Sequence, residues 1–161
     1  MKNAFIDANG ILTSWGYAES NNNDTLVEVS DSFNMTPGAA QYVSGTWSAY
    51  TPPVAPAALA SAAFAAGLAI VSTSTPALNG TYAIDQLSQM DIIAIETSLN
   101  AGKGFPGGSA TFSYADMSGT FHSFTAGSFT DFAAAVRDYV YALKSAIAGA
   151  STTLPSSTTI A

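Results

Sequence analysis

The chain contains no cysteine, and it has few charged residues. The missing cysteine excludes disulfide bonds, thiolate metal sites and cysteine nucleophiles. Charged residues make up 9% of the 161 residues, against about 25% in an average soluble domain. The surface must therefore be covered largely by Ser, Thr, Asn, Gln and Ala. Such a surface suits a subunit packed against its own copies or held in a larger assembly, and equally a plain extracellular protein.

Positive charge is especially scarce, and the formal net charge is −7. The four basic residues, which never cluster, are Lys2, Lys103, Arg137 and Lys144. We expect no nucleic-acid binding and no attraction to anionic membranes, because both need a concentrated cationic face. We also expect no membrane insertion. The most apolar stretch, 54–71, is rich in alanine and interrupted by Pro56 and Gly67, whereas a spanning helix needs about 20 strongly apolar residues.

The chain has a single histidine, His122, six residues after Asp116 in the segment SYADMSGTFHSFT. Alternating side chains predict a hairpin with strands at 110–114 and 120–124 around the loop ADMSG. Asp116 in the loop and His122 in the strand are then expected near opposite ends of the register. No G-x-S-x-G elbow accompanies them, and a lone histidine lacks the further ligands of a zinc site. We interpret His122 as structural; an intermolecular or pH-responsive contact and catalysis are the alternatives.

Other candidate sites have ordinary structural interpretations. The segment GKGFPGG at 102–108 lacks the spacing of a phosphate-binding loop. The acids near 7–10 and 21–24 lack the alternating ligand spacing of a calcium loop. We predict a protein that is not an enzyme and has no cofactor and no metal.

The sequence predicts an α+β fold in several parts. Residues 1–50 form a small β-rich module, with an Asn9-Gly10 hairpin in which both turn residues need positive φ, a strand at 25–29 and a second hairpin at Ser44-Gly45. Residues 51–67 form a proline- and alanine-rich linker with a helix ending at Gly67.

Residues 68–148 form the second, α+β module, which combines a β-hairpin and two helices. The first helix spans 85–101, and its apolar stripe is broad enough to indicate burial against a sheet or a partner. The last helix opens with a capping box at Ser128–Asp131 and is amphipathic to about 147. The tail at 149–161 is rich in Ser and Thr, and we expect it to be flexible unless a partner holds it.

Four aromatic residues in the N-terminal module are candidate binding residues: Trp15, Tyr17, Trp47 and Tyr50. They lie near predicted turns. One interpretation makes them the core of a very small sheet, which needs large side chains to bury any surface. The other makes them a surface that stacks on sugars or anchors an interface.

Two runs in the second half are similar to a known family: NGTYAIDQLSQMDIIAIETSLNAGKGFPGG and FSYADMSGTFHSFTAGSFTDFAAAVRDYVYAL. They resemble the C-terminal DUF4376-type domains of bacteriophage and prophage tail-fibre and tail-fibre-assembly proteins. The shared pattern is a helix start, a Gly-Pro turn, a D-x-x-G-x-x-H-x-F hairpin and an amphipathic helix. The matching positions are Tyr82, Asp85, Ser88, Gln89, Pro106, Asp116, Gly119, His122, Phe124, Tyr139 and Leu143. The N-terminal pattern F-I-D-x-x-G…P-G…Y-x-x-G-x-W resembles the β segment that often precedes this domain.

The resemblance implies a non-enzymatic virion component, since the family has no established catalytic residues. We expect a tail or tail-fibre-associated structural and attachment protein, made in the bacterial host cytoplasm and carried in the virion tail. Its expected partners are its own copies, with a trimer favoured by analogy, other tail proteins, and a host surface glycan. The alternatives are a tail-fibre assembly chaperone and a small carbohydrate-binding domain using Trp15, Tyr17 and Trp47.

Overall fold

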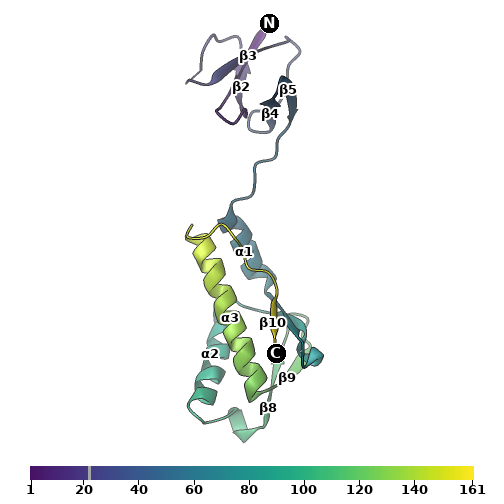
Figure 1. Ribbon diagram of the computed structural model, residues 1–161, viewed down its shortest axis with the longest axis vertical. Coiled ribbons are helices and arrows are strands. Elements are labelled where there is room, and N and C mark those ends of the chain that lie inside the picture. The colour runs from purple at the N-terminus through teal and green to yellow at the C-terminus, as the bar shows by residue number, and fades with distance from the viewer. Residues whose placement is uncertain (22) are drawn as a thin grey trace. The chain divides into compact units, whose positions relative to one another are not determined.

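The computed structural model describes residues 1–21 and 23–161, so Asn22, in the segment 21–24 weighed above as a calcium loop, lies outside the described residues (Figure 1). The chain divides into two compact units, Met1–Pro53 and Val54–Ala161. In the described residues the first unit holds β-strands, and the second combines strands with three α-helices. This arrangement confirms the predicted α+β class.

The N-terminal unit is built from two small antiparallel sheets. One sheet has the order β2-β1-β3 and the other is a hairpin; their strands are β1 (Lys2–Ile6), β2 (Leu12–Gly16), β3 (Thr25–Val29), β4 (Ala40–Val43) and β5 (Thr46–Ala49). The predicted Ser44-Gly45 turn is confirmed, with φ angles of 51° and 86°.

The first hairpin turns differently from the prediction. Gly10 has a φ of 78°, but Asn9 is not among the described residues with positive φ. Instead the carboxylate of Asp7 holds the loop, because its Oδ1 accepts the backbone N–H groups of Asn9 and Ile11 at 2.8 and 2.9 Å. The prediction of two positive φ angles is therefore wrong for Asn9.

The C-terminal unit is organised around its longest helix. Helices α1 and α2 and strand β10 all contact α3. The elements are α1 (Pro56–Ala66), β6 (Leu68–Ser72), η1 (Pro76–Leu78), β7 (Gly80–Tyr82), α2 (Gln86–Asn100), η2 (Pro106–Gly108), β8 (Thr111–Ala115), β9 (Phe121–Thr125), α3 (Ala126–Ile147) and β10 (Thr158–Ile160). Among the described residues, no helix has both the length and the apolar character to cross a membrane.

Helix α1 is part of the C-terminal core, whereas the sequence analysis assigned it to a linker at 51–67. It packs along α3, and Ala60 is fully buried in the shared core. Its alanines are small, so the helix can pack closely against α3, and Ala63 and Phe64 lie against the same core. Gly67 ends the helix as predicted, with a φ of 80°.

The predicted flexible tail is wrong at its end. Strand β10 pairs in parallel with β6, with Thr158 opposite Ile70 and Ile160 opposite Ser72. Ile160 is buried in the core, and the Ser72 hydroxyl donates to the Ala161 carbonyl. One isoleucine in a Ser/Thr-rich segment is enough to anchor the strand, because its burial accompanies a row of backbone hydrogen bonds.

Helix α3 supplies more buried residues to the C-terminal core than any other described element. Its buried positions recur at helical spacing, as predicted: Phe129, Phe132, Ala133, Val136, Val140 and Leu143. The helix begins one turn earlier than predicted, with Thr125 as its N-cap. The capping box therefore joins Thr125 and Ser128, whose side chains accept each other's backbone N–H groups at 3.0 and 3.3 Å.

Candidate functional site

The structure brings Asp116 and His122 together, so the expectation that they lie apart is wrong. In the β8–β9 hairpin, Tyr114 faces His122 across the register. Asp116 comes two residues later and so lies diagonally from His122 on the same face. His122 Nε2 is 3.2 Å from Asp116 Oδ2. The contact forms because diagonal neighbours in a hairpin are within reach of each other's side chains, even when one of them lies in the loop.

The other ring nitrogen of His122 is also engaged. Nδ1 lies 2.7 Å from the carbonyl oxygen of Ala77, and the ring is buried beside Tyr82. Each ring nitrogen therefore has an oxygen atom of the chain as its partner. A catalytic base needs a free nitrogen to take a proton from a nucleophile. Since both nitrogens are occupied, these are the contacts of a structural histidine.

Asp116 also organises the hairpin loop. Its Oδ1 accepts the backbone N–H groups of Ser118 and Thr120, each at 2.9 Å, and the Ser118 hydroxyl at 2.6 Å. The Ser118 hydroxyl, followed by His122 and the backbone groups, lowers the pKa of Asp116 to about 2. The loop then docks on β7, where Met117 N donates to the Thr81 carbonyl at 2.8 Å.

The tryptophans of the N-terminal unit belong to its small core. Trp15 and Trp47 are half-buried and lie on either side of Phe33, with ring centroids 6.2 and 4.9 Å from it. The indole of Trp15 donates to the Met35 carbonyl at 2.7 Å, and the Lys2 ammonium lies 4.4 Å from its ring centroid. This packing favours the core interpretation. Phe33, which was not among the predicted candidates, contacts both tryptophan rings.

The other two aromatic candidates lie apart from this cluster. Tyr17 is exposed, and its hydroxyl lies 3.5 Å from Asp31 Oδ1. Tyr50 is half-buried, and its backbone N–H donates to the Ala39 carbonyl. The four residues thus do not form one flat stacking platform.

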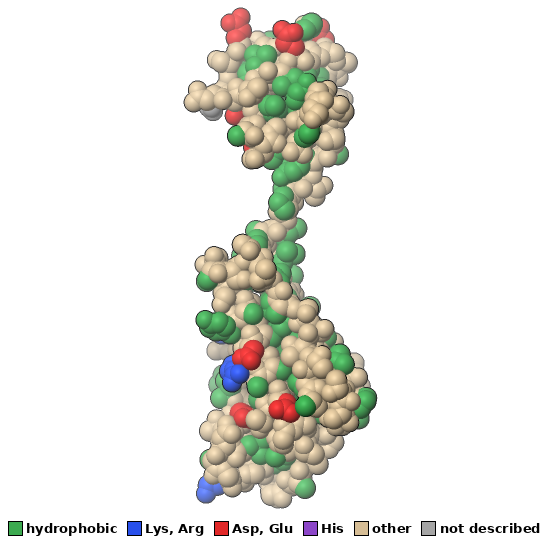
Figure 2. All heavy atoms as spheres, in the orientation of Figure 1, with side chains coloured by type: hydrophobic (Ala, Val, Ile, Leu, Met, Phe, Trp, Pro, Cys, Tyr) green, Lys and Arg blue, Asp and Glu red, His purple; other side chains and the backbone are tan. Residues whose placement is uncertain are grey.

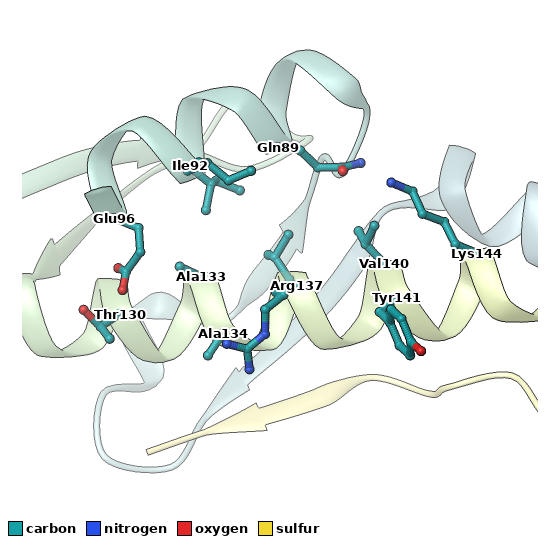
Figure 3. Close-up of a pocket in the computed structure, with 12 residues that line it drawn as sticks. Gln89, Ile92, Glu96, Thr130, Ala133, Ala134, Arg137, Val140, Tyr141 and Lys144 are labelled. Carbon is teal, nitrogen blue, oxygen red and sulfur yellow. The ribbon is translucent and has the colours of Figure 1, made fainter. Parts of the chain in front are cut away.

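An apolar groove of about 490 Å³ lies between α2 and α3 (Figure 3). Ile92 and Ile93 line it from α2, and Ala134, Val140 and Tyr141 line it from α3. The sequence signal for this groove was the breadth of the apolar stripe on α2. Within the C-terminal unit that stripe is only partly covered, because Ile92 is the only fully buried residue of the helix in the described structure.

The start of α2 is fixed by Asp85. Its Oδ1 accepts the N–H groups of Leu87 and Ser88 at 2.9 and 3.0 Å, and its Oδ2 accepts the Ser88 hydroxyl at 2.9 Å. These bonds, first that of the Ser88 backbone, lower the pKa of Asp85. The cap sets where the helix begins and so holds its exposed apolar side chains in fixed positions.

Polar groups stand at both ends and in the middle of the groove. Glu96 and Thr130 lie at one end and Lys144 at the other (Figure 3). The Glu96 Oε1 accepts from Asn100 at 3.1 Å, whereas Oε2 is buried without a hydrogen-bond partner among the described residues. Between the ends, Arg137 Nε donates to Asp138 at 2.7 Å. In the described part of the chain, no cluster of three His, Asp or Glu residues is placed to hold a metal ion.

No protein-family model, curated protein or solved structure matches this chain. The resemblance to phage tail proteins therefore stays a prediction.

Proposed function

We propose that the chain is a non-enzymatic structural component of a bacteriophage tail, associated with the tail or its fibre. The observation that carries this proposal is the uncovered apolar groove on the C-terminal unit. Monomeric proteins rarely expose contiguous apolar surface of this kind unless it binds something. An assembly subunit needs such a surface, and the family resemblance supplies the context of a phage tail.

The surface composition supports the same role. On the face of the C-terminal unit in Figure 2, charged side chains are sparse and lie among hydrophobic and neutral groups. Close packing in an assembly is easier for such a surface, since few charges must lose their water on contact. The two separate cores give the protein two distinct units for contacts with the tail and with an outer partner such as a host surface glycan.

Peptide mapping of purified virions tests the proposal. A structural component is expected in the particles in a fixed ratio to the other tail proteins. A tail-fibre assembly chaperone, the alternative role, is expected in infected cells and absent from the particles. Absence from purified virions would overturn the structural role.

A further inference from the structure

The apolar side chains around the groove extend beyond its floor onto the outer face of α2. Leu87, Met90 and Ile93 are spaced three residues apart and are 69%, 59% and 62% exposed. Tyr141 of α3, on the other wall, is 74% exposed. Residues three apart on a helix are neighbours, so the three α2 side chains form one stripe. The antiparallel helices α2 and α3 could pack with a second such pair, and the two pairs would form a four-helix arrangement.

We propose that this surface, the α2–α3 groove with its stripe, binds the same surface of a second copy of the chain about a two-fold axis. The proposal deepens the assembly role proposed above and rests on the same groove. A two-fold contact is self-complementary: each feature on one copy meets its counterpart across the axis. The distribution of polar groups along the groove meets that condition.

The two ends of the groove carry complementary groups. Glu96, at one end, lines the groove with a carboxylate whose Oε1 accepts from Asn100. Lys144, at the other end, is exposed and makes no ion pair or hydrogen bond in the described structure. A two-fold axis running across the groove places each end over the opposite end of the partner. Each Lys144 ammonium then faces a Glu96 carboxylate, which gives two equivalent ion pairs.

The middle of the groove is also compatible with the axis. Arg137 lies between the two ends (Figure 3), where the two-fold axis brings like residues of the two copies near each other. An unpaired arginine there would repel its own copy. Its ion pair with Asp138 supplies a negative charge beside it and offsets that repulsion.

Light scattering after size exclusion tests the proposal on the full chain over a range of concentrations. The expected particle has twice the 16.4 kDa mass of one chain. Lys144→Glu and, separately, Glu96→Lys are expected to weaken the dimer by about tenfold or more, because each places like charges across the interface. The double variant restores opposite charges and is expected to recover most of the wild-type affinity.

Two further variants separate interface from folding effects. Ile93→Asp changes an exposed position, so it leaves the fold intact and is expected to give monomer. Lys103→Glu makes the same charge reversal outside the groove lining and is expected to leave the dimer unchanged. Far-UV circular dichroism checks the fold of each variant.

A monomer at every concentration, a trimer, or a dimer indifferent to Lys144→Glu and Ile93→Asp would overturn the proposal. A monomer that captures an amphipathic helix of another tail protein would also overturn it. None of these outcomes bears on the presence of the chain in virions, so the failure of this proposal and that of the proposed function are distinguishable.

Discussion

His122 and Asp116 form a partly buried clasp, with 3.2 Å between Nε2 and Oδ2, that joins two parts of the C-terminal unit. The ring belongs to the β8–β9 hairpin, and its Nδ1 reaches Ala77, 45 residues earlier in the chain. The clasp therefore ties the hairpin to the turn before β7. Gly80 of β7 lies directly against both side chains.

Replacement of His122 by Phe is expected to destabilise the protein by about 2 kcal/mol. Phenylalanine keeps the packing against Tyr82 but leaves the Ala77 carbonyl and Asp116 Oδ2 without their imidazole partner. Leaving a hydrogen-bonding group unsatisfied away from water costs about 1–3 kcal/mol. Urea unfolding followed by circular dichroism measures the change. Ser123→Ala, on the exposed face of the same strand, is the control and is expected to change stability by less than about 0.5 kcal/mol. Equal losses for the two variants would contradict the clasp.

Gly80→Ala is expected to disturb the same clasp from the other side. A Cβ atom at Gly80 would lie 3.0 Å from Asp116 Oδ2 and 3.1 Å from His122 Nε2. The expected loss is about 1–3 kcal/mol, as for other overpacked sites. The control is Gly127→Ala in the first turn of α3, where nothing lies within 4 Å of the added methyl group. It is expected to be neutral or stabilising, because alanine has the higher helix propensity. If Gly80→Ala left the free energy of unfolding unchanged, the site would accommodate the added methyl group, and the expected crowding of Asp116 and His122 would be wrong.

The clasp also makes stability depend on pH in acid. The pKa of Asp116 is about 2 in the folded protein, below the ordinary 3.8. A depressed folded-state pKa contributes stability that is present above the unfolded value and is lost as pH falls through the folded one. The wild type is therefore expected to lose stability between about pH 4 and pH 2.

The melting temperature across pH 2–6 measures this dependence. Asp116→Asn is expected to have a lower melting temperature at pH 6 and a shallower fall toward pH 2. Ser118→Ala removes the hydroxyl that lowers the pKa of Asp116 most, so its fall is expected to be smaller and to end at a higher pH. Parallel curves for all three proteins would assign the acid sensitivity to other carboxylates.

The sequence predicted features that depend on local patterns. The Ser44-Gly45 turn needs two positive φ angles, and glycine adopts such angles readily. The buried positions of α3 follow helical spacing. A short window of sequence therefore contains the signal for each feature. The start of α3 was misplaced, because Thr125 and Ser128 are both good capping residues and the choice depends on where β9 ends.

Features that join distant segments were not predictable in this way. Ile160 pairs with Ser72 of β6, 88 residues earlier in the chain. Ala60 of α1 is buried because α3 packs against α1, and α3 lies far along the sequence. The Asp116–His122 contact is short-range, and the hairpin register places the two residues diagonally on the same face. The groove had a signal in the apolar stripe of α2, but which side of that stripe stays exposed depends on how α3 packs against it.

The two units are expected to unfold in separate transitions, each followed by its own probe. Both tryptophans of the chain, Trp15 and Trp47, lie in the N-terminal unit. The described helices all lie in the C-terminal unit, so tryptophan fluorescence reports the first unit and circular dichroism at 222 nm the second. The small core of the N-terminal unit makes it the less stable of the two.

Matched core truncations test this independence. Leu12→Ala in the N-terminal core and Leu143→Ala in α3 each remove a fully buried leucine, and each is expected to cost its unit about 3 kcal/mol. Leu12→Ala is expected to shift the fluorescence transition alone, and Leu143→Ala the circular dichroism transition alone. If either variant shifted both transitions together, the units would be coupled in folding, and the division at Pro53 and Val54 would not be a thermodynamic one.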